Sequence, residues 1–266
     1  MQDPVTGVAV NGTFTWDTPA VKLNAGSHNA KWTFTPDKSY GGKYTTNTGT
    51  ATVTVNPKAV TVSGITANDK VYDGTTNAGL DYSAVTLGGV LENDTLTVTA
   101  TGTMESADVG EKKVTISNLT LGGDSAANYV LAESGNQTET TATITAKEVT
   151  VTPDNKSKVY EEKDPKLTYI VSGVLSGETL KGITLARAEG ENAGEYDITA
   201  TADAGANPNY EVTFAEGKFT INPKSIDGAT VKLGKALTAN GAEQTQTVEK
   251  VLLNDKELPA DSYTVA

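Results

Sequence analysis

Two short stretches bring together residue types that acid–base chemistry uses: Lys70–Thr76, which reads KVYDGTT, and Lys158–Asp164, which reads KVYEEKD. In the first, Tyr72 and Asp73 are adjacent, and Glu92 follows further along the chain. Catalysis requires such groups to converge in a cleft with shifted pKa values. The second stretch keeps the lysine, valine and tyrosine, while its carboxylates move and its glycine is lost. We therefore predict a strand end with a packed tyrosine and a variable turn, and no enzyme.

Other kinds of site fit the sequence poorly. The chain has no cysteine, which excludes disulfides, thiolate metal ligands and a cysteine nucleophile. The pairs Gly88-Gly89 and Gly122-Gly123 lie between alternating runs and indicate turns, whereas a phosphate loop would open a helix. A calcium ion at a module seam is an open alternative, although the nearby carboxylates lack the alternating spacing of a calcium loop. Those carboxylates are Asp154, Glu161, Glu162 and Asp164. We predict no catalytic, cofactor-binding or metal-binding residues and no cofactor.

The composition limits the partners. The net charge of −12 disfavours nucleic-acid binding, because an acidic surface repels phosphates. No apolar run approaches the roughly 20 residues of a membrane span, so we predict no span in this chain. The opening residues, MQDPVTG, lack the basic and apolar regions of a signal peptide, and we expect a fragment of a longer protein.

Alternation with a period of two residues predicts an all-β fold. Ala51–Val55 reads ATVTV and Thr95–Thr99 reads TLTVT, so each strand has one buried and one exposed face. No stretch keeps a helical period for three turns, and we expect little helix. Trp16 and Trp32 lie in such strands; they could stack on sugars, but we favour core positions. Leu258–Ser262 is interpreted as a loop that enters a strand.

The strands recur in a longer repeat. Similar seams surround Lys58, Lys147 and Lys224, and between them several landmarks keep their order. The paired landmarks are KVYDGTT with KVYEEKD, Gly89–Leu96 with Gly173–Leu180, Asp108–Lys112 with Asn192–Tyr196, and Asn128-Tyr129 with Asn209-Tyr210. Two complete modules are therefore flanked by two partial ones. The predicted boundaries are 1–57, 58–146, 147–223 and 224–266.

Each complete module has the strand number and length of an Ig-like β-sandwich, and we predict tandem sandwiches arranged end to end. Asn192–Tyr196 fits a tyrosine corner, in which the tyrosine hydroxyl bonds to the backbone at a strand corner. The only histidine, His28, occupies the corresponding place after Asn24-Ala25-Gly26, so we predict a structural or surface role for it. The first piece should lack opening strands and the last piece closing strands. We expect the resulting free edges to fray or to pair with a neighbouring chain, end to end.

The residues also carry a family resemblance. Residues 58–147 resemble the YDG domain of bacterial surface and haemagglutinin-like proteins, through Val71–Thr76 and Asn128-Tyr129. Residues 148–223 resemble the bacterial Ig-like family called MBG, although Glu161 stands where that family has glycine. The matching residues are Val159-Tyr160, Asp164–Tyr169, Gly173, Asn192–Tyr196 and Asn209-Tyr210. The ends resemble partial bacterial Ig-like repeats, through Gly12–Trp16 and Trp32–Pro36 in the first.

The resemblance implies a non-catalytic stalk or spacer of a secreted bacterial surface protein or adhesin, located outside the cell. Two alternatives remain: a module that binds a host glycan or protein, and an accessory region of a large secreted glycosidase. Some bacterial Ig-like stalks also form amide cross-links between a lysine and an asparagine or aspartate beside a buried acid. The residue types are abundant here, but no recognisable motif for this cross-link is present.

Overall fold

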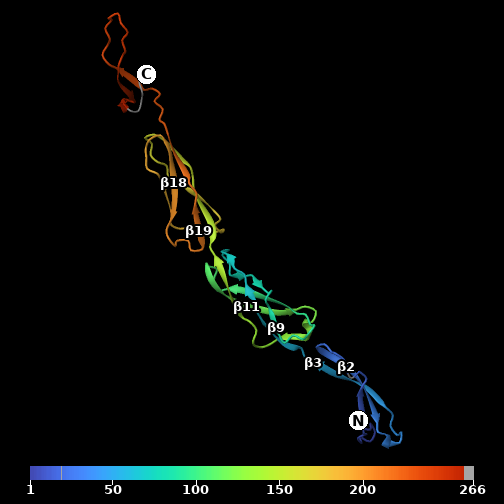
Figure 1. The fold of residues 1–266 in the computed structure, drawn as a ribbon. Coiled ribbons are helices and arrows are strands. Elements are labelled where there is room, and N and C mark those ends of the chain that lie inside the picture. The colour runs from blue at the N-terminus through green and yellow to red at the C-terminus, as the bar shows by residue number, and fades with distance from the viewer. Residues whose placement is uncertain (19, 261–266) are drawn as a thin grey trace. The chain divides into compact units, whose positions relative to one another are not determined.

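The computed structural model describes residues 1–18 and 20–260. It divides into two compact units: unit 1 comprises Met1–Lys147 and Pro208–Glu211, and unit 2 comprises Glu148–Asn207 and Val212–Ala266. The described helical elements are two 3-10 turns, η1 (Lys38–Tyr40) and η2 (Ala126–Asn128), and the other elements are β-strands (Figure 1). The all-β prediction is confirmed. Within these ranges no helix is long and apolar enough to cross a membrane.

Residues 1–57 form an antiparallel sheet of β1 (Gly12–Trp16), β2 (Gly26–Pro36) and β3 (Asn47–Val55). Phe14 lies opposite Phe34 and Trp16 opposite Trp32, so the aromatic side chains share one face and threonines line the other. This is the only sheet among the described residues of this segment. As a result Trp16 stays 49% exposed, and the core position predicted for it is wrong.

Residues 58–146 form a β-sandwich of two main sheets, one ordered β6-β13-β11-β10-β7 and the other β12-β4-β9, with β5 and β8 paired separately. The core joins both sheets, because Val62 of β4 packs with Val98 of β10 and Ile116 of β11. The strands are β4 (Lys58–Ser63), β5 (Thr66–Ala67), β6 (Lys70–Val71), β7 (Asn77–Ala78), β8 (Leu80–Asp81), β9 (Thr86–Gly88), β10 (Thr97–Met104), β11 (Gly110–Gly122), β12 (Tyr129–Leu131) and β13 (Glu139–Thr145).

Residues 147–223 also form two sheets, ordered β15-β20-β18-β17 and β16-β14-β19. The strands are β14 (Lys147–Pro153), β15 (Lys156–Val159), β16 (Tyr169–Ser172), β17 (Ile183–Arg187), β18 (Gly194–Ala202), β19 (Tyr210–Phe214) and β20 (Gly217–Asn222). Ile198, Phe219 and Ile221 form the core of the first sheet, and the apolar side chains of β14 are equally buried. The alternation of buried and exposed positions along β18 and β20 follows the sequence pattern.

The repeated landmarks occupy matching places in the two sandwiches. Lys70 of β6 lies parallel to β13 opposite Ile144, and Lys158 of β15 lies parallel to β20 opposite Ile221. Gly89 and Gly173 have φ values of 95° and 92°, and each approaches the backbone of its module's first strand. The sequence repeat is therefore a repeat in three dimensions.

Residues 224–260 contain a small antiparallel sheet of β21 (Thr230–Leu233), β22 (Val248–Leu253) and β23 (Lys256–Glu257). The seam before this sheet is longer than the two earlier seams. Asn56-Pro57 alone separates β3 from β4, and Ala146 alone separates β13 from β14, but residues 223–229 separate β20 from β21. A turn at Gly228, with φ of 83°, occupies part of this longer seam.

Candidate functional site

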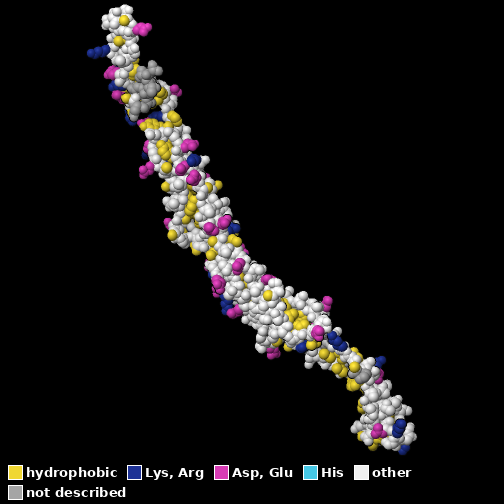
Figure 2. All heavy atoms as spheres, viewed as in Figure 1, with side chains coloured by type: hydrophobic (Ala, Val, Ile, Leu, Met, Phe, Trp, Pro, Cys, Tyr) yellow, Lys and Arg dark blue, Asp and Glu magenta, His cyan; other side chains and the backbone are white. Residues whose placement is uncertain are grey.

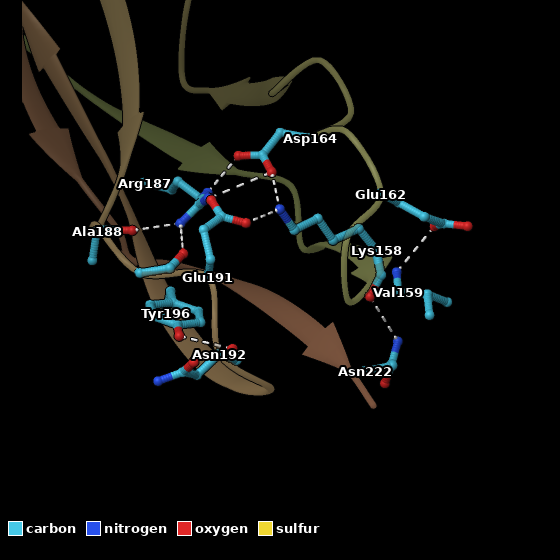
Figure 3. A network of polar contacts seen from close by, with 11 residues as sticks. Lys158, Val159, Glu162, Asp164, Arg187, Ala188, Glu191, Asn192, Tyr196 and Asn222 are labelled. Atoms are coloured by element: carbon cyan, nitrogen blue, oxygen red, sulfur yellow. Dashed lines mark hydrogen bonds and ion pairs between the residues drawn. The ribbon is translucent and has the colours of Figure 1, made fainter. Parts of the chain in front are cut away.

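Four charged side chains of unit 2 form a connected network (Figure 3). Lys158 at the end of β15 has a side chain only 3% exposed, and its Nζ lies 2.7 Å from Asp164 Oδ1. It also bonds to the carboxylate of Glu191. The guanidinium of Arg187, at the end of β17, binds the same two carboxylates. The network thus joins β15, the loop that follows it and the β17–β18 loop.

Arg187 anchors this network to the core and to the backbone. Its guanidinium carbon lies 5.0 Å from the ring centroid of buried Phe219, a distance that allows a cation–π interaction. Its Nη1 donates to the carbonyl oxygens of Ala188, at 2.9 Å, and Gly190, at 2.7 Å. A planar guanidinium with several donors can satisfy all these acceptors at once. The arginine therefore holds the β17–β18 loop in place.

The electrostatics keep the network fully charged. Arg187, and then Lys158, lower the pKa of the Asp164 carboxyl, while Lys158 and then Arg187 lower that of Glu191. The bonds to Asp164 and Glu191 raise the pKa of Lys158. A general acid or base must exchange its proton near neutral pH, and these shifts move each group away from that range. The arrangement suits a structural brace.

The charged states of these side chains oppose the formation of an amide cross-link. Lys158 and Asp164 are within bonding reach beside the acid Glu191, but amide formation requires a neutral amine and a protonated carboxyl group. The pKa shifts of all three groups favour the opposite protonation states. We expect the intact mass of the chain to equal the mass of its sequence. A mass lower by one water would instead indicate a Lys158–Asp164 amide.

The first KVY stretch contains a corresponding brace. The Nζ of Lys70 bonds to Asp73 Oδ1 at 2.8 Å, to the carbonyl oxygen of Thr75 at 2.7 Å and to that of Asn77 at 3.0 Å. Asp73 Oδ1 also accepts the backbone N–H of Thr75 at 2.8 Å. In both modules the recurring lysine folds onto the loop that follows its strand. The sequence contains a signal for this brace, because lysine begins both stretches. The prediction of a packed tyrosine did not use that signal.

The Asp73 brace predicts a measurable titration. Its bond to Lys70, supported by the Thr75 N–H, lowers the pKa of Asp73 from 3.8 to about 2. Because the folded-state pKa is below the unfolded one, this carboxylate stabilises the fold above pH 3.8 and loses that effect as the pH falls towards 2. Carbon-detected NMR titration should show the low pKa directly. In Lys70→Met the pKa of Asp73 should rise towards 3.8, and an unchanged value would contradict the brace.

The tyrosines of the two stretches differ in their surroundings. Tyr72 is 8% exposed and lies edge-on to Tyr210, with ring centroids 5.5 Å apart inside unit 1, so the predicted packing is confirmed there. Tyr160 is 39% exposed, and the prediction of a packed tyrosine is wrong for it. Within the described residues Glu92 makes no hydrogen bond or ion pair, so it does not join Tyr72 and Asp73 in one site.

The four loosely clustered carboxylates point to separate partners. Asp154 accepts from Thr168, Glu162 accepts the Val159 N–H, and Asp164 belongs to the lysine network. Glu161 has φ of 71°, a left-handed conformation that glycine adopts most readily, and its carboxylate bonds to Lys224 at 2.7 Å. Across residues 1–18 and 20–260 no cluster of three metal-ligating side chains is present.

The corner segments behave as the sequence indicated. Tyr196 Oη donates to the carbonyl oxygen of Asn192 at 2.8 Å, which confirms the tyrosine corner. His28 Nε2 lies 2.7 Å from the carbonyl oxygen of Asn24, so the histidine makes the corresponding bond in the first piece. This bond is a local structural contact at the position that the sequence indicated for His28.

Two corners, at Asn24-Ala25 and at Asp108-Val109, are bound by the asparagine of an Asn-Tyr landmark, an arrangement that we call the asparagine clamp. Asn128 Oδ1 accepts the backbone N–H of Ala25 at 2.8 Å, and its Nδ2 donates to Asn24 Oδ1 at 3.3 Å. Sequence reasoning found both landmarks but did not bring them together, because the bond spans about a hundred residues.

A second clamp within unit 1 uses the same atoms. Asn209 Oδ1 accepts the N–H of Val109 at 3.0 Å, and Asn209 Nδ2 donates to Asp108 Oδ1, also at 3.0 Å. Because the same donors and acceptors pair at two separate places, the clamp is a recurring feature of the repeat. In each clamp, within unit 1, the asparagine side chain of one repeat binds the corner of the repeat before it.

The fold and these contacts define a chain of repeated β-modules, and comparison with known families agrees. Residues 56–142 match the YDG domain, and residues 149–220 match the MBG domain of the YGX type. The resemblance deduced from KVYDGTT and KVYEEKD is therefore confirmed, and domains of these kinds occur in bacterial surface proteins. No curated protein matches the chain.

Proposed function

We propose that the chain is a non-catalytic spacer region of a bacterial surface protein, which projects a binding domain from the cell. The observation that supports this most strongly is the asparagine clamp between Asn24-Ala25 and Asn128. It couples the first piece to the YDG module across a two-residue seam, Asn56-Pro57, within one compact unit. Proline in so short a seam further restricts the backbone. A spacer needs such limits on bending between its modules.

The surface is consistent with this role. Acidic and basic side chains are interspersed on the face drawn in Figure 2, and the lysines and arginines form no continuous stripe there. Such a surface keeps a repeated chain soluble without selecting nucleic acid. The charged networks around Lys158 and Lys70 brace loops and offer no convergent reactive groups, which supports a non-catalytic role.

The clamp supplies the test. We expect Asn128→Ala to leave both β-structures folded but to increase the range of end-to-end distances across the Asn56-Pro57 seam, as measured by paired spin labels and small-angle scattering. The backbone amide of Ala25 should also lose protection from hydrogen exchange. Asn29→Ala, an exposed change on the same first sheet, is the matched control. If both variants give the wild-type distance distribution, the clamp does not limit bending, and the spacer proposal fails.

A second function is favoured by a separate observation. Phe14 and Trp16 on β1 are 57% and 49% exposed, and Phe14 lies 5.3 Å, centroid to centroid, from Trp32. Exposed aromatic platforms of this kind mark binding surfaces. We propose glycan binding on this face as the alternative. A glycan array on which the chain and its Trp16→Ala variant give equal signals would reject it.

A further inference from the structure

In each sandwich a short strand near the start of the module pairs in parallel with the last strand. In the MBG module of unit 2, β15 pairs with β20 from Lys156 to Val159. In the YDG module of unit 1, β6 pairs with β13 at Lys70 and Val71. We call each of these pairings the closing ladder of its module, and we call β6 and β15 the early strands.

A side chain extends each closing ladder at the start of the early strand. Asn155, just before β15, accepts the backbone N–H of Lys218 on its Oδ1 at 2.8 Å. Asp69, just before β6, accepts the backbone N–H of Thr143 on its Oδ1 at 2.6 Å. The two acceptors occupy the same place in the repeat, so the closing ladder has the same first bond in both modules.

The tyrosine of the KVY stretch extends each closing ladder at its other end. The N–H of Tyr160 donates to the carbonyl oxygen of Asn222 at 2.9 Å, and the N–H of Tyr72 donates to that of Thr145 at 2.8 Å. The lysine two positions before each tyrosine bonds to the loop that follows the early strand. The early strand is therefore held both to the last strand and to its own loop.

The parallel arrangement determines how tension along the chain acts on a closing ladder. Tension pulls β15 from the side of Lys156 and β20 from the side of Asn222, and these residues lie at opposite ends of the ladder. The strands must slide past each other, so the evenly spaced bonds of the parallel ladder carry the load together. In an antiparallel pair the two pulled residues would be neighbours, and the bonds would break one after another.

We propose that each complete module bears tension along the chain and that its closing ladder limits the rate at which the module unfolds under load. This inference rests on the proposed spacer function, because a spacer that joins a cell to a bound partner is pulled at both ends. Forced unfolding is governed by the unfolding rate, so resistance to tension depends on the bonds that break first and not on equilibrium stability alone.

The direction of pulling tests the closing ladder of the MBG module. The chain has no cysteine, so handles for optical tweezers can be attached to the full chain at two introduced cysteines. Lys156→Cys with Lys224→Cys loads β15 and β20 at opposite ends of the ladder, whereas Glu161→Cys with Lys224→Cys loads them at the same end. Both variants lose the ion pair between Lys224 and Glu161, so this pair does not contribute to the difference.

At equal force, the module pulled at opposite ends of the ladder should last more than about fivefold longer. Each additional hydrogen bond that breaks in the same step contributes about that factor. Equal lifetimes in the two directions would overturn the proposal, because the strands would then not share the load.

Removal of one ladder bond distinguishes resistance to tension from equilibrium stability. With the full chain pulled from its ends, Asn155→Ala should shorten the lifetime of the MBG module about fivefold, and Asp69→Ala should do so for the YDG module. The YDG module is recognised by its longer extension step, because it releases more residues. Asn207→Ala is the matched control in unit 2, because Asn207 bonds to the backbone of Lys181 at 2.8 Å and 3.0 Å, outside the closing ladder.

The control should lower the free energy of unfolding in urea and leave the lifetime under force unchanged, because a bond still intact when the ladder breaks does not affect that rate. If Asn155→Ala and Asn207→Ala shorten the lifetime equally, or if neither does, the closing ladder does not carry the load and the proposal fails. Bending at the Asn56-Pro57 seam is measured without load. A chain whose seam resists bending but whose modules yield equally in both directions would keep the spacer function and lose the load-bearing one.

Discussion

Replacing Phe219 by alanine is expected to destabilise unit 2 by about 3–5 kcal/mol, the usual cost of emptying a large buried aromatic site. Phe219 on β20 is fully buried and packs with Ile198, Ile221 and the partly buried Leu167 and Tyr196. Its ring also faces the guanidinium of Arg187. The substitution therefore removes a core side chain and the aromatic support of the charged network together.

Hydrogen exchange measured by mass spectrometry would locate the effect. Peptides from β18 and β20 should lose protection in Phe219→Ala, and those from β10 and β11 should not change. Phe214→Ala is the matched control, because Phe214 is 42% exposed and its loss should cost no more than about 0.5 kcal/mol. Equal losses of protection in the two variants would show that Phe219 is not the centre of the core.

The second large effect is expected for Gly173→Ala. Gly173 has φ of 92°, and a Cβ atom there would lie 2.7 Å from the carbonyl oxygen of Glu148. The backbone conformation costs a residue with a Cβ about 1–2 kcal/mol, and the forced contact with β14 about 1–3 kcal/mol more. We expect the free energy of unfolding of unit 2, measured in urea, to fall by about 2–5 kcal/mol.

Two other glycines separate these contributions. Gly177 has φ of 87°, but a Cβ atom there would meet nothing within 4 Å, so Gly177→Ala should show the backbone cost alone. Gly89, the counterpart of Gly173 in unit 1, would place its Cβ atom 3.1 Å from the Ala59 oxygen, and Gly89→Ala should be milder than Gly173→Ala. If Gly173→Ala and Gly177→Ala were equally destabilising, close packing on β14 would not be the reason for glycine at this landmark.

Most of the fold could be predicted from the sequence, because alternation and repetition are local signals. ATVTV predicted a strand, and the strand is the end of β3. KVYDGTT and KVYEEKD predicted equivalent places, and both run parallel to the closing strand of their module. Asn192–Tyr196 predicted a tyrosine corner from five consecutive residues, and the bond is present.

Features that depend on distant partners could not be predicted. The exposure of Trp16 depends on whether a second sheet covers β1, and alternation along one strand carries no information on that. Lys158 pairs with both Asp164 and Glu191, which are far apart in the sequence and come together only when the chain folds. The clamp joins Asn128 to residues more than a hundred positions earlier. The loop predicted at Leu258–Ser262 falls partly on Asp261 and Ser262, which lie outside the described residues.

The asparagine clamp has a consequence for how such arrays change over generations. Half of each clamp is a backbone N–H, of Ala25 in one case and Val109 in the other, so it survives any substitution at that position except proline. The other half is a hydrogen bond from the asparagine Nδ2 to a side-chain oxygen, which Asn24 supplies in one clamp and Asp108 in the other. Modules that have diverged in sequence can therefore still be neighbours, and an array can lengthen, shorten or exchange units by gene duplication and recombination without new joints having to evolve.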